Sequence, residues 1–177
     1  MLLVDAKTGR KLWGHDQPTK HIHSQGMVAD VLADFEGMEV YGGESDYPKR
    51  WLYSAKGNLI QFLTEGSLSI RPLWWDADPQ KEVITQKRNA PDGTIHNWGD
   101  EKALQQFEGK AIAVVDCLGD HREELITALK GELRIYSTTI PAIDRRPFLM
   151  QNHQYGMGVV AQTTGYYYPA QLGETAK

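Results

Sequence analysis

Short apolar runs alternate with polar turns along the whole chain, and one such pattern occurs three times. Each copy has an apolar pair, an Asp, a polar turn with a second Asp, an acidic residue and another apolar pair. The copies cover residues 28–40, 74–84 and 114–126. Their first aspartates, Asp30, Asp76 and Asp116, are taken as equivalent and lie 46 and then 40 residues apart. Short strands that repeat every roughly 40 to 50 residues indicate a β-propeller or a related array.

A second pattern follows each copy and consists of an apolar strand, a polar turn with Gly, and another apolar strand. It covers residues 51–60, 88–95 and 127–136. Lys-Gly or Asp-Gly between apolar runs predicts a β-hairpin, because glycine accepts the positive φ of the turn. Residues 2–13 form a further Gly hairpin without an Asp pattern before it. Each unit is therefore predicted as strand, Asp turn, strand, Gly turn, strand, and the chain enters in the middle of a unit.

These units predict an all-β fold, the C-terminal portion of a β-propeller with about three to four blades. The expected units are residues 1–25, 26–72, 73–110 and 111–140, followed by a closing tail, 141–177. Within them, residues 99–109 are predicted as a loop or short helical turn, and the tail is expected to hold one short helix near 152–161. A closed propeller has four to eight blades, so we expect the remaining blades in a longer parent protein, where they cover the open edge.

Composition narrows the possible partners. The 177 residues are 41% hydrophobic and 24% charged, which is ordinary for a globular protein. The net charge is −4 and there is no basic cluster, so nucleic acid is not an expected partner. No apolar run approaches the roughly 18 residues of a membrane span, and the first residues lack the basic region of a signal peptide.

The paired aspartates of the turns have two possible roles, and both stay open. An Asp in a tight turn accepts hydrogen bonds from backbone N–H groups two residues on. Several carboxylates in one turn also match the oxygen ligands of calcium. The candidate calcium ligands are Asp30, Asp34, Asp76, Asp78, Asp116 and Asp120.

Taken together, the patterns resemble the rhamnogalacturonan lyases of polysaccharide lyase family 11, which cleave pectin. The segments that carry the resemblance are 5–13, 26–30, 35–39, 55–57, 74–78, 119–124, 135–139, 149–150 and 160–169. The resemblance covers most of the chain. It implies the C-terminal part of an eight-bladed propeller, a pectic polysaccharide as partner, calcium as a possible cofactor, and a secreted or periplasmic location.

The chain departs from that family at two places. Gln25 stands where the family has an Arg that faces the substrate groove. Residues 107–110 replace an Asn-Gly-Thr-Lys segment, so Lys110 is the candidate for its substrate-facing Lys. The Tyr of the terminal Gly-Tyr pair is kept as Tyr166.

The chemistry of a lyase defines what the site must contain. β-Elimination at a uronic acid requires that a cation neutralise the C5 carboxylate, that a base remove the neighbouring proton, and that an acid or solvent assist the leaving oxygen. His21 and His23 would share one side of a strand, as a base with a helper or as two metal ligands, unless they are ordinary loop histidines.

The second group of candidates lies around the chain end. Lys110 and Tyr166 are the catalytic candidates there, and Tyr167 and Tyr168 join Gln25 as candidates for substrate binding. Aromatic rings are natural platforms for sugar rings, although terminal tyrosines can simply close the fold.

Two other functions compete with a lyase. A non-catalytic propeller relative that binds polysaccharide is favoured by the loss of the Arg at position 25 and of the Asn-Gly-Thr-Lys segment at residues 107–110. A quinoprotein-like propeller is suggested by residues 5–13, which fit the Asp-x-x-Thr-Gly-x-x-x-Trp docking pattern of those blades. That pattern should recur in every blade and occurs here once, which makes the quinoprotein the weakest of the three.

Overall fold

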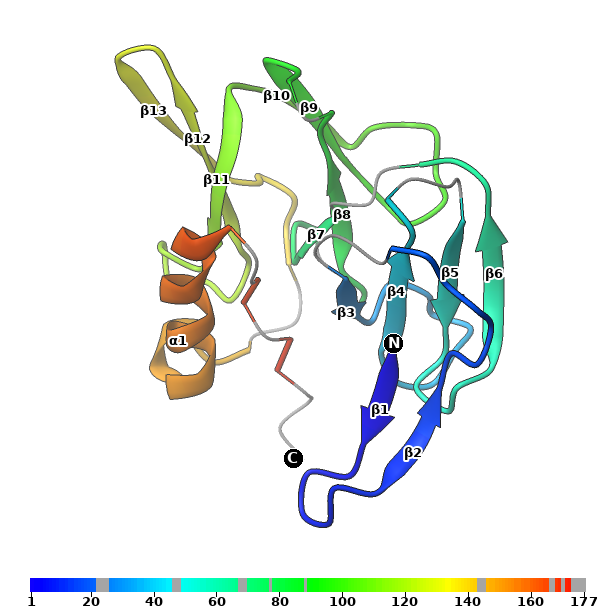
Figure 1. The fold of residues 1–177 in the computed structure, drawn as a ribbon. Coiled ribbons are helices and arrows are strands. Elements are labelled where there is room, and N and C mark those ends of the chain that lie inside the picture. Colours follow the sequence, from blue (N-terminus) through cyan, green and yellow to red (C-terminus); the bar gives the residue numbers. More distant parts are fainter. Residues whose placement is uncertain are drawn as a thin grey trace.

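The computed structural model describes residues 1–21, 26–45, 49–66, 70–76, 78–87, 89–142, 146–165, 168–169 and 171–172. Within these ranges, four antiparallel β-sheets follow one another along the chain, and a helical segment comes after the last sheet (Figure 1). The first sheet is a hairpin of β1 (Leu2–Val4) and β2 (Lys11–Gly14). The second contains β3 (Met27–Ala29), β4 (Glu39–Gly43), β5 (Arg50–Tyr53) and β6 (Leu59–Leu63), in that spatial order.

The third and fourth sheets repeat this arrangement, in which each strand pairs with the next one in the sequence. The third contains β7 (Arg71–Leu73), β8 (Glu82–Thr85), β9 (Asp92–His96) and β10 (Gln105–Glu108). The fourth contains β11 (Lys110–Val115), β12 (Glu124–Leu129) and β13 (Glu132–Tyr136). The all-β prediction is confirmed for these sheets.

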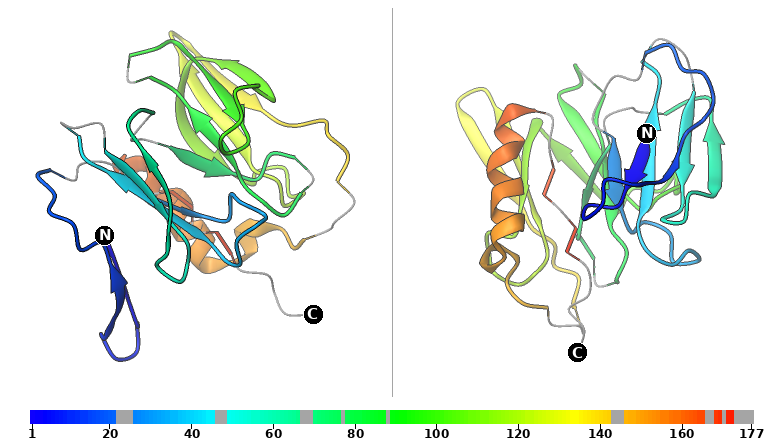
Figure 2. Two further views of the ribbon diagram at one scale, coloured as in Figure 1. Left: turned by 90° about the vertical axis from the view of Figure 1, so that its right-hand side faces the viewer. Right: turned by 60° about the horizontal axis from the view of Figure 1, so that its bottom comes forward.

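The helical segment consists of η1 (Leu149–Gln151), α1 (His153–Ala161) and η2 (Gln162–Thr164). The helix expected near 152–161 is therefore present. Asn152 caps it, because its side chain accepts a hydrogen bond from the Tyr155 N–H. Figure 2 shows α1, in orange, lying alongside β11. Among the described residues, no helix has both the length and the apolar character needed to cross a membrane.

Apolar side chains between consecutive sheets form the core. One cluster, between the second and third sheets, is built around Met27, Leu52 and Val83. Another, between the third and fourth sheets, is built around Leu73, Ile95 and Leu125. Both clusters contain residues from the first strands of the sheets, such as Met27 and Ala29 of β3. These two residues share one face of the sheet because alternate positions of a strand point to the same side. Each of these sheets thus buries apolar side chains against its neighbour.

Two backbone hydrogen bonds connect these sheets in the same way. The Lys81 N–H donates to the Asp30 carbonyl oxygen at 2.7 Å, and the Glu123 N–H donates to the Trp74 carbonyl oxygen at 2.8 Å. In both cases the donor precedes the second strand of one sheet, and the acceptor follows the first strand of the sheet before it. The repeat therefore extends from the sheets to the contacts between them.

The strand pairing gives the repeat a register different from that of the sequence pattern. In each of the three larger sheets, the last residue of the first strand pairs with a glutamate that opens the second strand. These pairs are Ala29–Glu39, Leu73–Glu82 and Val115–Glu124. The next residue is Asp30 in the second sheet and Asp116 in the fourth, but it is Trp74 in the third. The prediction that Asp76 is their equivalent is wrong, because the pairing of Leu73 with Glu82 puts Trp74 in that position.

Two further expectations are corrected in the third sheet. Residues 105–108 of the predicted loop form β10, which pairs with β9 as its edge strand. Gly93, predicted in a hairpin turn, lies inside β9 instead. A Cβ atom at Gly93 would lie 2.3 Å from Cζ of Phe107, so glycine here allows the Phe107 ring to pack against the strand rather than allowing a turn.

Candidate functional site

The glutamate that opens the second strand of each larger sheet fastens the turn before it. Its carboxylate accepts hydrogen bonds from two successive backbone N–H groups of that turn. The donors are Val31 and Leu32 for Glu39, Trp75 and Asp76 for Glu82, and Cys117 and Leu118 for Glu124, at 2.7 to 3.2 Å. All three glutamates are buried, and burial raises the pKa of Glu82 to about 7. These acids therefore hold the turns in place.

The aspartates of the fourth sheet also serve the backbone. Asp116 Oδ1 accepts from the Gly119 N–H at 2.9 Å, and its Oδ2 accepts from the Leu149 N–H at 2.8 Å. Asp120 forms an ion pair with Arg122. Within the described ranges, the candidates Asp116, Asp120, Asp30 and Asp34 do not belong to any group of three or more possible metal ligands.

The turn of the third sheet does gather three carboxylates. Oxygens of Asp76, Asp78 and Glu82 lie within 4.8 Å of one another. Burial and then the Asp76 charge raise the pKa of Asp78, which indicates mutual repulsion. The Asp78 N–H donates to Asp76 Oδ1 at 2.9 Å, and the Gln80 N–H donates to Asp78 Oδ1 at 2.8 Å. Oxygen ligands that repel one another at this spacing fit a hard cation such as calcium.

Lys110 lies at the opposite end of the sheets, where β10 passes into β11 through Gly109 alone. Its side chain is exposed, and its backbone is held on both sides. Gln86, which follows β8, donates from Nε2 to the Gly109 carbonyl oxygen at 2.9 Å and accepts from the Ala111 N–H at Oε1 at 3.1 Å. Arg71, the first residue of β7, donates from Nη1 to the Ala111 carbonyl oxygen at 2.9 Å.

Tyr168 belongs to the same region. The Arg71 guanidinium carbon lies 5.7 Å from the centre of the Tyr168 ring, a cation–π arrangement. Burial raises the pKa of the Tyr168 hydroxyl to about 12, so the phenol is neutral at ordinary pH. The structure therefore brings Tyr168 and the backbone beside Lys110 to a common partner, Arg71.

His21 lies in the segment that leads to β3. It is exposed, and its carbonyl oxygen accepts from the Ser45 N–H at 3.0 Å. The Lys20 N–H donates to Glu44 Oε1 at 2.8 Å, so this segment is held against the connection between β4 and β5. His23, Gln25, Tyr166 and Tyr167 lie outside the described residues, and their predicted roles stay predictions.

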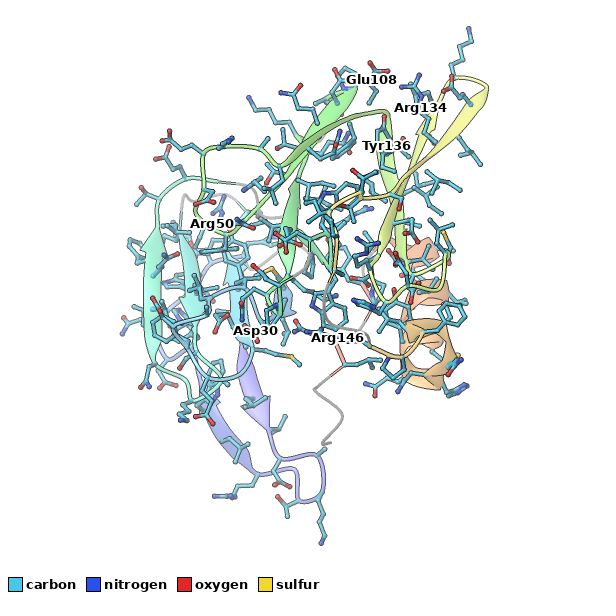
Figure 3. The ribbon with its side chains drawn as sticks, turned by 180° about the vertical axis from the view of Figure 1, so that it is seen from behind. Asp30, Arg50, Glu108, Arg134, Tyr136 and Arg146 are labelled. Atoms are coloured by element: carbon cyan, nitrogen blue, oxygen red, sulfur yellow. The ribbon has the colours of Figure 1, made fainter. Side chains whose placement is uncertain are left out.

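A groove of about 530 Å³ lies between the β9–β10 edge and β13. In Figure 3 its labelled residues Glu108, Arg134 and Tyr136 gather at the top, whereas Asp30 and Arg146 lie lower. Arg134 forms ion pairs with Glu108 and Glu132. Among the candidates that lie in the described part of the chain, none lines this groove.

Sequence reasoning missed Arg71 and Gln86. Each forms its contact with a residue 23 to 40 positions away, and neither stands in a motif. If the repeats are aligned by their strand pairing, Arg71 and Lys110 occupy the same position, because each opens the first strand of its sheet. No local signal marks Gln86.

Comparison with known proteins gives one family. The family model described as rhamnogalacturonan lyase family 11, C-terminal domain, matches residues 1–174. The chain is 33% identical to rhamnogalacturonan endolyase YesW of Bacillus subtilis over 93% of its length, and it covers 27% of that protein.

Solved structures agree with this result. Exotype rhamnogalacturonan lyase YesX superposes with a TM-score of 0.76 at 27% identity, over 93% of this chain and 30% of that one. The Bacillus licheniformis rhamnogalacturonan lyase PL11 gives 0.73 at 30% identity, over 94% and 29%. The chain thus spans less than a third of the length of these relatives.

Proposed function

Because the chain belongs to rhamnogalacturonan lyase family 11, as its C-terminal domain, we propose that the protein containing it cleaves rhamnogalacturonan by β-elimination. The observation that carries this proposal is Arg71, which lies over the Tyr168 ring and donates to the Ala111 carbonyl oxygen directly beside Lys110. This arrangement combines cations for a uronate with an aromatic ring for a sugar face. A pectic polymer as substrate goes with a secreted or periplasmic location.

The proposed reaction has three parts: neutralisation of the carboxylate, removal of a proton, and departure of the leaving oxygen. The Lys110 ammonium neutralises the C5 carboxylate of a galacturonate unit and so acidifies the C5–H. A histidine of the segment before β3, His21 or His23, removes that proton. The C4–O bond then breaks, a C4=C5 double bond forms, and Tyr166 donates a proton to the leaving oxygen. Gln25, Tyr167 and Tyr168 contact the neighbouring sugars.

The larger sheets are proposed as blades of a propeller, eight-bladed in the longer protein. Support comes from the order of their strands, each paired with the next, and from the repeated hydrogen bonds between sheets at Asp30 and Trp74. The remaining blades are the proposed partners of the exposed strands β1 and β13.

The direct test is the ultraviolet absorbance of unsaturated uronate. We expect the absorbance to rise when the full-length protein acts on rhamnogalacturonan, and not on homogalacturonan. Retention of the polymer by the folded protein without any rise would favour the non-catalytic, polysaccharide-binding relative, which the Gln25 substitution also favours.

We further propose that Asp76, Asp78 and Glu82 are the ligands of a calcium ion. The known hydrogen bonds occupy Oδ1 of each aspartate and Oε2 of Glu82, so the second oxygen of each carboxylate is the one offered to the ion. Calcium would supply positive charge that relieves the repulsion within this turn.

Calcium binding is expected to raise the thermal midpoint of unfolding. At 100 times its Kd, a ligand that binds only the folded state adds about 2.7 kcal/mol to the free energy of unfolding. Differential scanning fluorimetry with calcium, magnesium or chelator would measure the shift. Asp78→Asn should abolish it, whereas Glu101→Gln, at an exposed carboxylate, should leave it intact. An equal calcium shift in both variants would contradict this site.

A further inference from the structure

We infer that Gln86 is a positioning residue for Lys110, holding the backbone on both sides of it so that its ammonium is directed at the substrate. This inference rests on the function proposed above, in which Lys110 contacts the uronate. Gln86 directly follows β8 of the third sheet, whereas Lys110 opens β11 of the fourth.

The Gln86 side chain pairs with the backbone around Lys110 as a peptide group of a neighbouring strand would. The Gln86 carboxamide donates to the Gly109 carbonyl oxygen at 2.9 Å and accepts from the Ala111 N–H at 3.1 Å. A carboxamide has the same donor and acceptor as a peptide group, so it pairs with both backbone groups that flank Lys110. One side chain therefore fixes the direction in which the Lys110 Cα–Cβ bond leaves the backbone.

The backbone at this point needs such support. Gly109 has a φ of +91°, and a Cβ there would lie 2.5 Å from Cδ1 of Leu129, so the link between β10 and β11 is a tight, left-handed turn of one residue. The β11–β12 pairing is irregular between Ala111 and Ala113. Regular sheet pairing alone therefore does not fix the position of Lys110.

Arg71 completes the support from the same sheet. Its Nη1 donates to the Ala111 carbonyl oxygen, while its guanidinium lies over the Tyr168 ring. Gln86 is uncharged, and both ends of its carboxamide contact backbone groups, those of Ala90, Gly109 and Ala111, so we assign it a role through the backbone that it holds. The four-carbon side chain of Lys110 has many rotamers, and a fixed backbone limits where its ammonium can reach.

Kinetics of the full-length protein test this inference through a change that removes only the hydrogen bonds. Gln86→Met, similar in shape and without the carboxamide, is expected to lower kcat by roughly 10- to 100-fold with KM little changed, because small misplacements of a reacting group cost about that much. The matched control is Gln106→Met, at an exposed glutamine of β10, which should keep the original kcat.

A double variant separates positioning from a general loss of structure. If Gln86 acts through Lys110, then Gln86→Met should cause no further loss of kcat in a Lys110→Ala background. Amide hydrogen exchange supplies a readout that needs no activity: exchange at Ala111 should be slow in the original protein and fast in Gln86→Met.

The outcomes distinguish the two proposals. An unchanged kcat in Gln86→Met, or the same fold-loss with and without Lys110, would overturn the positioning role. Equal exchange at Ala111 in both proteins would overturn it as well. A third outcome is fast exchange at Ala111 in Gln86→Met but not in the original protein, with no product released by either. This would overturn the proposed lyase function and leave the backbone contact established.

Discussion

Lys110→Ala is expected to lower kcat on rhamnogalacturonan by about 1,000-fold, within the range seen when one electrostatic or acid–base group is removed from an active site. The loss has a physical basis in the proposed reaction, since the C5–H becomes acidic only when the neighbouring carboxylate is neutralised. Arg71 would remain, but its guanidinium already donates to the Ala111 carbonyl oxygen. Initial rates of unsaturated uronate release measure the effect.

The fold should survive this change. Lys110 is exposed, and substitutions at exposed positions usually alter the free energy of unfolding by less than about 0.5 kcal/mol. Lys130→Ala is the matched control, because Lys130 is an exposed lysine in the turn between β12 and β13. A Lys110→Ala protein that keeps its rate would remove Lys110 from the reaction and transfer the neutralising role to Arg71.

Much of the fold was predictable because its signals are local. Gly131 has a φ of +78° in the turn between β12 and β13, where the sequence predicted a Gly turn. The short helix of the tail was likewise predicted. The family resemblance, based on the order of many short segments, is confirmed by the family model that matches residues 1–174.

The predictions that the structure corrects depended on contacts between residues far apart in the sequence. The Trp74–Trp75–Asp76 segment matches the composition of the repeat, but the pairing of Leu73 with Glu82 shifts its register. Both tryptophans are buried, Trp74 against Leu149 and Tyr155 and Trp75 between two sheets. A tryptophan in the place of the aspartate is possible only because the distant tail covers it.

The candidate site was predictable only in part, for the same reason. Lys110 could be proposed from a family segment, whereas Gln86 and Arg71 are recognised only once the third and fourth sheets are in place. Lys81 illustrates the same limit. Lysine side chains are almost never fully buried unless they are paired, yet that of Lys81 is 1% exposed.

That burial creates a polar network inside the core. Lys81 Nζ lies 2.8 Å from Glu123 Oε2 and 4.3 Å from the centre of the Trp74 ring. Glu123 Oε1 accepts from the Tyr155 hydroxyl at 2.8 Å, and that hydroxyl accepts from the Asp116 N–H at 3.0 Å. Burial and the Glu123 charge raise the pKa of Tyr155. The network thus ties helix α1 to the third and fourth sheets.

Lys81→Met is therefore expected to lower the free energy of unfolding by about 3 to 5 kcal/mol, because it leaves the Glu123 carboxylate buried without its cation. Urea unfolding of the full-length protein, followed by the fluorescence of its tryptophans, would measure the change in midpoint. Lys56→Met is the matched control: Lys56 and Glu36 are also 2.8 Å apart, but their side chains are 70% and 86% exposed, so the midpoint should barely move.

A second substitution separates the unpaired charge from a loss of packing. Adding Glu123→Gln to Lys81→Met removes the stranded charge and keeps a carbonyl oxygen for the Trp74 N–H, which donates to Glu123 at 2.8 Å. We expect the double variant to be more stable than Lys81→Met alone. If it is instead less stable, by the sum of the two single effects, then the ion pair is not coupled, and the stability of this region comes from the apolar contacts of Trp74 and Tyr155.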